Sequence, residues 1–156
     1  MPLKLIHQQA GRRFSRYVEI DFPHLTSIKA QRISRSPKLT TLLSESASNT
    51  SDTLTSTPTA PSMLPPPTQK PYTVEKGGTQ LISDVYALLT LDLRISPAET
   101  LTNSLLPYLR PDRPVLFLSE CVFCYMELDL SREIIGWFGK TFERVAGVVY
   151  EMCGLK

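Results

Sequence analysis

Three acidic side chains stand where short apolar runs end. Asp21 closes residues 16–21, Asp92 closes residues 85–92 and Glu120 closes residues 115–120. Continuous apolar runs of this length are typical of parallel strands that are covered on both faces. Ligands of open α/β sheets bind just beyond the carboxyl ends of such strands. We therefore expect the three acids to lie along one edge of a sheet, where they would hold a small molecule.

The chemistry open to such a row is binding of a nucleoside that carries an amino-acid tail. Asp21 could accept hydrogen bonds from both ribose hydroxyls, a role that acids have at strand ends in dinucleotide-binding folds. Asp92 could accept one from an adenine amino group, and Glu120 could form a charge-assisted hydrogen bond with the ammonium of a methionine moiety. The alternative is that each acid caps the helix that follows it, since Asp is common at helix starts. Both interpretations stay open at this point.

Helical patterns follow the apolar runs, so strands alternate with helices. Pro23 suits the first turn of a helix that carries Leu25, Ile28 and Ile33 at helical spacing. A fourth strand is expected over residues 145–151. This alternation predicts βαβ units and an α/β fold with a mostly parallel sheet.

Two further helices have start signals of their own. Ser96, Pro97 and Glu99 show the spacing of a capping box with proline at the first helical position. Another helix should run to about residue 143 and present an apolar face to a sheet. Its candidate caps are Asp129 or Ser131, and its apolar face is Ile134, Ile135, Phe138 and Phe142.

Residues 34–76 interrupt this pattern and are predicted to be a disordered insertion. Between residues 34 and 71, 23 of the 38 residues are serine, threonine or proline. Such a composition buries too little apolar surface to offset the entropy cost of ordering the chain. Residues 65–67, three prolines, are expected to be extended in polyproline II form. A proline-rich ligand for a partner domain is the less favoured alternative.

The composition is that of a globular chain without a membrane or nucleic-acid partner. The 156 residues suffice for one domain, and the net charge of +2 comes from scattered side chains, not from a basic stripe. No apolar run approaches the roughly 20 residues of a membrane span, and the first residues lack the core of a signal peptide. We expect a cytoplasmic monomer with reduced thiols. Cys121 and Cys124 have C-x-x-C spacing without a second pair, so they should be ordinary buried cysteines and not metal ligands.

Four segments at or near the predicted strands carry a more specific pattern. They are residues 17–23 (YVEIDFP), 91–94 (LDLR), 118–126 (LSECVFCYM) and 148–152 (VVYEM). In this order they resemble the leucine carboxyl methyltransferases, and the E-C-V-x-x-Y-M block is specific to that family and its close relatives. Those enzymes use S-adenosylmethionine to methylate the C-terminal leucine carboxylate of the protein phosphatase 2A catalytic subunit. The resemblance implies a Rossmann-like methyltransferase sheet, this cofactor and this partner.

The same resemblance assigns roles to individual residues. Asp21 would bind the ribose, Asp92 with Leu93 the adenine, and Glu120 the methionine end of the cofactor, while Tyr125 would be the catalytic-site residue near the target carboxylate. A leucine carboxylate is already ionised at neutral pH, so no general base is required. Catalysis is then mainly alignment, and Glu120 is expected to bind and not to abstract a proton.

The chain also departs from the family pattern. The family's G-x-G-x-D turn has no counterpart before Asp21, where Gly11 stands alone, and the family's substrate-recognising portion has no counterpart either. We therefore expect residues 1–156 to form a partial methyltransferase domain with impaired activity. Two alternatives are a related methyltransferase acting on a modified tRNA base or a small metabolite, and a non-catalytic remnant that only binds a partner.

Overall fold

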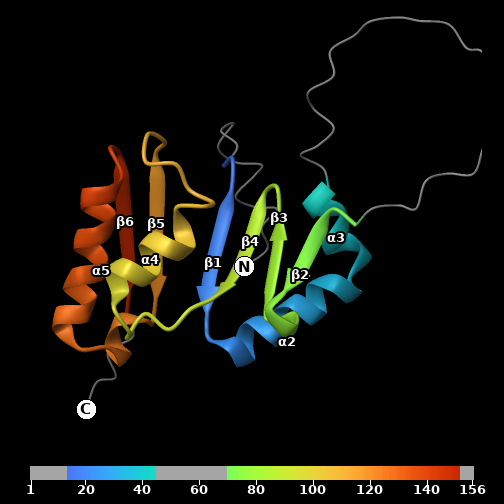
Figure 1. Cartoon of the computed structure of the whole chain (residues 1–156), viewed down its shortest axis with the longest axis horizontal. Helices are drawn as coiled ribbons and strands as arrows, with labels where there is room; N and C mark the ends of the chain where they lie inside the picture. Colours follow the sequence, from blue (N-terminus) through green and yellow to red (C-terminus); the bar gives the residue numbers. More distant parts are fainter. Residues whose placement is uncertain (1–13, 45–69, 152–156) are drawn as a thin grey trace, which may run out of the picture. The chain divides into compact units, whose positions relative to one another are not determined.

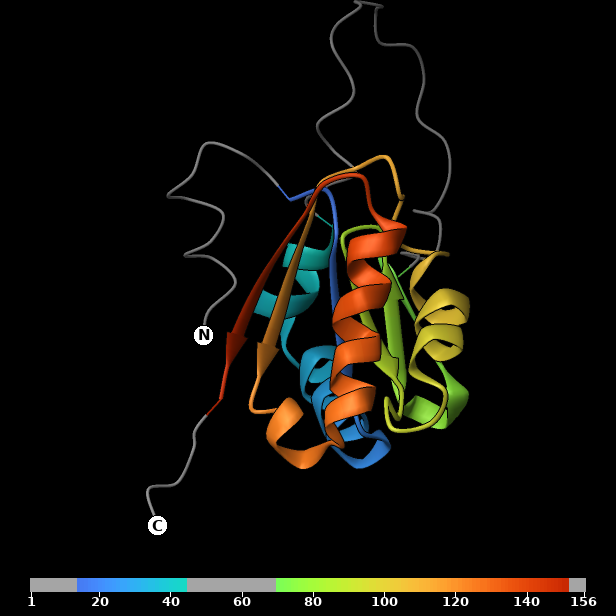
Figure 2. The same cartoon turned by 90° about the vertical axis from the view of Figure 1, so that its left-hand side faces the viewer.

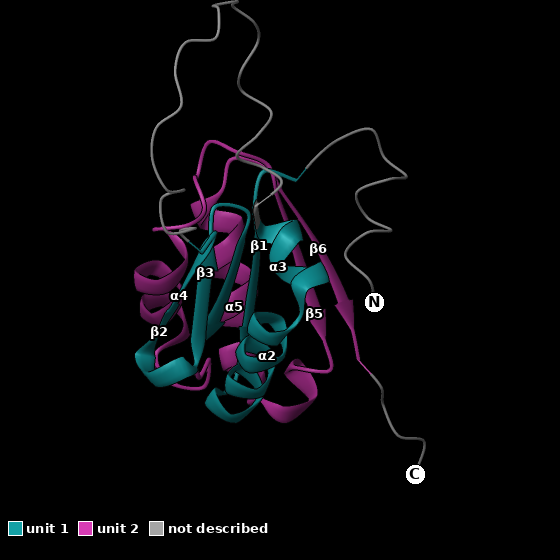
Figure 3. Ribbon diagram, turned by 90° about the vertical axis from the view of Figure 1, so that its right-hand side faces the viewer, with its two compact units in different colours: residues 1–90 teal, residues 91–156 magenta. Residues whose placement is uncertain are grey.

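The computed structural model describes residues 14–44 and 70–151 of the chain. The chain divides into two compact units, residues 1–90 and residues 91–156 (Figure 3). Each unit has its own sheet and its own helices (Figure 1). The predicted α/β class is therefore confirmed. The described strands form a mixed sheet of four in the first unit and a parallel sheet of two in the second, which is compatible with the expected mostly parallel sheet, while its Rossmann-like character stays a prediction.

The first unit is built on a sheet with the strand order β1-β4-β3-β2. Its strands are β1 (Tyr17–Asp21), β2 (Tyr72–Glu75), β3 (Gln80–Ser83) and β4 (Tyr86–Thr90). β1 and β4 run parallel, with Asp21 in register with Thr90, whereas β3 pairs antiparallel with both β4 and β2. The two parallel strands are the predicted ones, and their β-branched and aromatic side chains explain why local sequence sufficed to find them.

The predicted disordered insertion over residues 34–76 is wrong at both of its ends. Helix α3 (Pro37–Ser44) lies at its start, and β2 with the short turn η1 (Lys76–Gly78) lies at its end. Residues 45–69, which include the three prolines, lie outside the described residues. The missed signal for the β2–β3 hairpin was Gly77–Gly78 between two strand-forming runs, because both glycines take positive φ angles of 66° and 92°.

Gly77 gives a direct test of this hairpin. Its φ of 66° is left-handed, and a Cβ added there would meet nothing within 4 Å. The Gly77→Ala variant should therefore lose about 1–2 kcal/mol of unfolding free energy through backbone strain alone. Urea denaturation followed by circular dichroism measures the loss. Gly77→Asn is the matched control, because asparagine tolerates this conformation, and equal losses in the two variants would contradict the explanation.

Helix α2 (Pro23–Arg35) begins at the predicted proline but turns a different face to the sheet than the apolar spacing suggests. Its buried residues are Thr26, Ala30 and Ile33. Leu25 and Ile28 are 44% and 49% exposed, so only Ile33 of the predicted set lies in the core. A buried hydrogen bond explains which face of the helix is covered. The hydroxyls of Thr26 and Thr90 lie 2.7 Å apart and share a hydrogen bond, which satisfies the fully buried Thr26.

The second unit is built on two parallel strands and two helices. They are α4 (Pro97–Leu105), β5 (Val115–Glu120), α5 (Leu128–Thr141) and β6 (Val145–Tyr150). β5 and β6 pair in register with Glu120 opposite Tyr150, and α4 and α5 pack against each other (Figure 2). Both strands and both helices were predicted from the sequence and are confirmed. The predicted details of α5 are wrong in two respects: its N-cap is Glu127, so that the candidate caps Asp129 and Ser131 lie inside the helix, and Ile135 of the predicted apolar face is 50% exposed. No helix in the described part of the chain is long and apolar enough to cross a membrane.

An aromatic cluster forms the core of the second unit. Phe138 stacks on Phe117 of β5 with ring centroids 4.4 Å apart, and Trp137 meets Phe138 edge to face at 5.0 Å. The indole Nε1–H of Trp137 donates a 2.8 Å hydrogen bond to the Thr102 hydroxyl of α4. A buried indole needs such a partner, so this bond joins the two helices without leaving a polar atom unpaired.

The predicted capping box at the start of α4 is wrong. Ser96 has a φ of 43° and makes no capping hydrogen bond with its side chain. The amide of Ala98 donates instead to the Glu133 carboxylate of α5, at 3.0 Å. The orphan donor at the helix start is thus satisfied from a neighbouring helix, which local sequence spacing does not reveal.

Candidate functional site

Glu120 is the last residue of β5, and its side chain is exposed. Within the described ranges, no side chain or amide pairs with its carboxylate. The ladder continues one step further, because the amide of Cys121 donates to the Tyr150 carbonyl at 2.7 Å. Cys121 has a φ of 51°, a conformation that non-glycine residues seldom adopt, so the chain turns sharply immediately after the acid. A strand end thus holds an available carboxylate at a fixed place.

A carboxylate from the other strand holds the loop that follows. Glu151, directly after β6, accepts hydrogen bonds from the amides of Val122, Phe123 and Cys124 at 3.3, 3.0 and 3.1 Å. Desolvation alone would raise the pKa of Glu151, but hydrogen bonds from the Cys124 thiol and these amides outweigh it and lower the pKa. The hydrogen bond to Glu151, with some desolvation, raises the pKa of Cys124.

The thiols differ in part from expectation. Cys121 is half-buried and Cys124 is exposed, so the prediction of two ordinary buried cysteines is wrong for Cys124. Both are free thiols. No group of three or more potential metal ligands gathers anywhere in residues 14–44 or 70–151.

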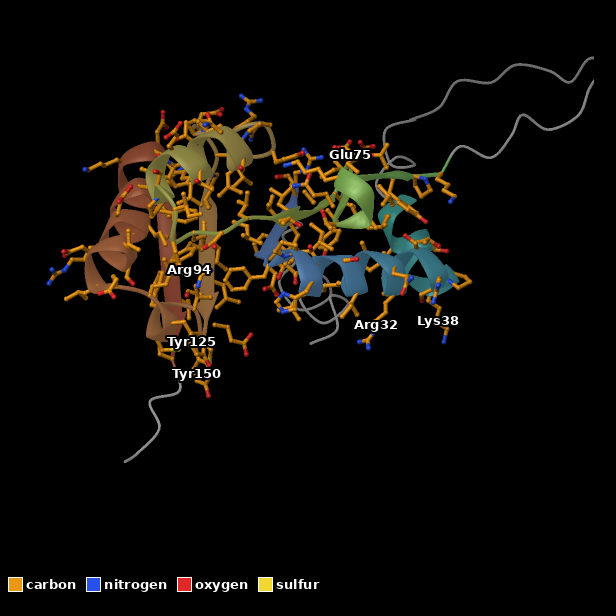
Figure 4. The ribbon with its side chains drawn as sticks, turned by 60° about the horizontal axis from the view of Figure 1, so that its bottom comes forward. Arg32, Lys38, Glu75, Arg94, Tyr125 and Tyr150 are labelled. Atoms are coloured by element: carbon orange, nitrogen blue, oxygen red, sulfur yellow. The ribbon has the colours of Figure 1, made fainter. Side chains whose placement is uncertain are left out.

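An open cavity of about 410 Å³ lies beside this loop in the second unit. Its lining residues are Arg94, Cys124, Tyr125, Met126, Glu127 and Leu130. Tyr125, in the short turn η2 (Phe123–Tyr125), is 78% exposed. Arg94 and Tyr125 lie on the same side of the unit (Figure 4). The cavity thus combines a cation, a phenol and two apolar side chains.

Asp92 follows β4 by two residues and is held by Arg94. The Arg94 guanidinium donates from Nε to one carboxylate oxygen at 2.9 Å and from Nη2 to the other at 2.7 Å. The Arg94 amide adds a third bond at 3.0 Å. These bonds from Arg94 lower the pKa of Asp92 to about 2. Leu93 between them is half-buried.

The Asp92–Arg94 pair has a defined pH dependence. Because its pKa is lowered, the Asp92 carboxylate contributes stability above about pH 4, and this contribution is lost as the pH falls from there through about 2. The pair is close to solvent, so we expect its contribution to the stability to be small. The carboxyl ¹³C shift of Asp92, followed by NMR, should titrate near pH 2 in the parent chain and near pH 4 in Arg94→Gln. An unchanged midpoint in the variant would contradict the role of Arg94.

Asp21 ends β1 in the first unit. One of its carboxylate oxygens, Oδ1, accepts a 2.8 Å hydrogen bond from the amide of Phe22. Phe22 itself stands at the start of α2, and no side chain caps that helix. The alternative in which Asp21 caps the next helix is therefore not what the structure has. The predicted row of three acids spans the two units and stays a prediction.

Sequence reasoning missed two residues at this site, Arg94 and Glu151. Arg94 was visible as the third residue of an Asp-x-Arg pattern that permits a local ion pair. Glu151 closes an apolar run in the same way as the three acids that were singled out. Its pattern was therefore present, but only the pairing of β5 with β6 brings its carboxylate to the loop after Glu120.

Each unit has a parallel strand pair that leads into an acid-bearing segment, an arrangement typical of α/β proteins that bind ligands beyond their strand ends. The family model described as leucine carboxyl methyltransferase matches residues 6–139. The chain belongs to this family of methyltransferases, which confirms the resemblance found in the sequence.

Relatives with curated names agree with this assignment. Two proteins named Leucine carboxyl methyltransferase 1, from strains JEC21 and B-3501A of Cryptococcus neoformans var. neoformans serotype D, are each 53% identical over 159 aligned residues, or 97% of this chain. A Leucine carboxyl methyltransferase 1 homolog from Arabidopsis thaliana is 31% identical over 137 residues, 86% of this chain. The chain spans 40%, 36% and 33% of the lengths of these three relatives.

Proposed function

We propose that this protein takes part in methylation of a protein C-terminal leucine carboxylate, with S-adenosylmethionine as the methyl donor and the protein phosphatase 2A catalytic subunit as the acceptor. The observation that carries the proposal is the family match over residues 6–139. The proposed setting is the cytoplasm, and the proposed fold of the longer relatives is a Rossmann-like methyltransferase domain.

The acids of the chain suit the groups of this cofactor. The carboxylate of Glu120 is exposed and available for an ammonium group, for which a charge-assisted hydrogen bond is the strong form of contact. Asp21 uses Oδ1 for the Phe22 amide, which leaves Oδ2 for a ribose hydroxyl. Both oxygens of Asp92 already accept from Arg94, so an adenine amino group would use a remaining lone pair.

The cavity beside the loop suits the acceptor. Met126 and Leu130 offer apolar contact for a leucine side chain, and Tyr125 offers a phenolic hydroxyl to a carboxylate. The bound cofactor supplies an electrophilic methyl group. Because the leucine carboxylate is ionised at neutral pH, the chain has only to orient it and to exclude water.

A methyl-transfer assay tests the proposal. The purified full chain is incubated with methyl-labelled S-adenosylmethionine and a peptide that ends in a free leucine carboxylate. We expect a label that base treatment releases, as it does from a methyl ester, and we expect it to form slowly, because activity of residues 1–156 is proposed to be impaired. The same peptide with a C-terminal amide is the matched control and should stay unlabelled. Absence of label on the carboxylate peptide, or transfer to tRNA instead, would overturn the proposal for this chain.

A further inference from the structure

We propose that Glu151 is a positioning residue that holds the loop of residues 122–126 and so places Tyr125 at the cavity. The claim that the loop is clamped rests on contacts within the second unit alone. Its meaning for methyl transfer rests on the proposed function.

The first argument is the hydrogen-bond inventory of the loop. The turn η2 makes two internal bonds, from the Tyr125 amide to the Val122 carbonyl at 3.2 Å and from the Met126 amide to the Phe123 carbonyl at 3.1 Å. These two bonds use the amides of Tyr125 and Met126, so the turn itself gives the amides of residues 122–124 no carbonyl acceptor. All three donate to the one carboxylate of Glu151. Glu151 therefore does for this turn what a capping residue does for a helix, but from a different strand.

The second argument is the place of the clamp. β5 and β6 are parallel and in register, so Glu120 pairs with Tyr150 and the next rung brings Glu151 beside the chain that leaves Glu120. The left-handed conformation at Cys121 bends the chain, so that the amides of the loop reach this carboxylate. The same loop then supplies Cys124, Tyr125 and Met126 to the cavity. The carboxylate of Glu151 thus holds the segment that follows β5, and this segment forms part of the cavity wall.

The third argument is the chemistry of the four donors, three amides and one thiol. A carboxylate has about four lone-pair sites and a negative charge, so it accepts three amides and the Cys124 thiol together. A glutamine has one acceptor oxygen and a donating NH₂ group, so it satisfies part of the set and presents a donor to the rest. The number of donors therefore requires a glutamate at this position. A side chain of the same size without the negative charge does not satisfy all of them.

Amide hydrogen exchange, read by NMR on the full chain, tests the clamp. In Glu151→Gln, which conserves size, the amides of residues 122–124 should exchange at least tenfold faster, while amides of α5 keep their rates. Glu151→Ala should give a larger effect at the same residues. Glu143→Gln, an exposed acid before β6, is the matched control and should change none of them. Unchanged rates at residues 122–124 in a folded Glu151→Gln chain would overturn the proposal.

The thiol of Cys124 gives a second readout that reports charge and not merely structure. Glu151 and Cys121 act on the pKa of Cys124, and the titratable or charged side chains that line the same cavity are Arg94, Tyr125 and Glu127. In a chain with Cys121→Ser and Cys153→Ser, the alkylation rate of Cys124 by iodoacetamide is measured against pH. Adding Glu151→Gln should move the midpoint to lower pH, because the carboxylate that raises the pKa of Cys124 is gone. A midpoint that stays in place would contradict the contact.

A binding measurement on the cofactor and a kinetic measurement on the peptide separate this inference from the proposed function. If calorimetry shows no binding of S-adenosylmethionine to the parent chain, the proposed function fails, while amide exchange still decides on the clamp. If the parent chain methylates the leucine peptide, Glu151→Gln should raise the KM for that peptide at least threefold and leave the cofactor Kd unchanged. A rise in the cofactor Kd alone would overturn the assignment of the loop to the acceptor side.

Discussion

Replacing Glu120 by glutamine is expected to weaken S-adenosylmethionine binding by about 10- to 100-fold. The carboxylate stands exposed at the end of β5 and has no partner in the described part of the chain, so its charge is available to a ligand. A hydrogen bond to a charged group contributes about 1.5–3 kcal/mol, which is the stated range in affinity. Isothermal titration calorimetry measures the change in Kd.

The control for this prediction is Glu143→Gln, which removes an equal charge from an exposed position outside the site. It should leave the Kd within about twofold, because surface charges distant from the ligand are screened by salt. Glu120→Asp adds a second comparison, since it keeps the charge but shortens the side chain by one methylene. If Glu120→Gln binds the cofactor as tightly as the parent, Glu120 is not the ammonium ligand.

The second large effect is expected in the core of the second unit. Phe138 is 7% exposed and packs on Phe117, Trp137 and Phe142. Phe138→Ala should lose about 3–5 kcal/mol of unfolding free energy, because truncation of a buried aromatic ring removes its transfer energy and leaves a cavity. Such a loss is a large share of the stability of an ordinary domain, so the unit should be partly unfolded at 37 °C.

Urea denaturation followed by the fluorescence of Trp137, the one tryptophan of the chain, measures this loss in the same unit. Ile135→Ala is the matched control, since Ile135 is on the same helix but 50% exposed. It should cost less than about 1 kcal/mol. Similar losses in the two variants would mean that the face of α5 toward β5 is not the one that the structure has.

The sequence predicted most of the elements because their signals are local. The β-branched run of β1 and the amphipathic spacing of α5 depend on residues within a few positions of one another, and both elements lie where they were expected. The errors came where composition hid a short-range signal. The serine, threonine and proline content around residue 60 predicted disorder as far as residue 76. The turn at Gly77–Gly78, which makes the β2–β3 hairpin, was therefore not predicted.

The buried face of α2 shows a different kind of limit. Leu25 and Ile28 have apolar spacing, yet the helix buries Thr26 because Thr90 of a strand 64 residues away offers it a hydroxyl. The start of α4 is similar, since Glu133 of another helix replaces the expected serine cap. Neither choice is encoded within the helix itself, because the deciding partner comes from elsewhere in the fold.

For the site, the sequence by itself determined that Glu120 ends a strand and that its surroundings belong to the leucine carboxyl methyltransferase family. These are properties of one contiguous stretch, so periodicity and motif were enough. Only the tertiary structure decided that Arg94 holds Asp92 and that Glu151 holds the loop bearing Tyr125. The first contact joins two residues that are close in sequence, but it depends on how the Arg94 side chain folds back. The second depends on the pairing of β5 with β6, because Glu151 lies far from that loop in sequence.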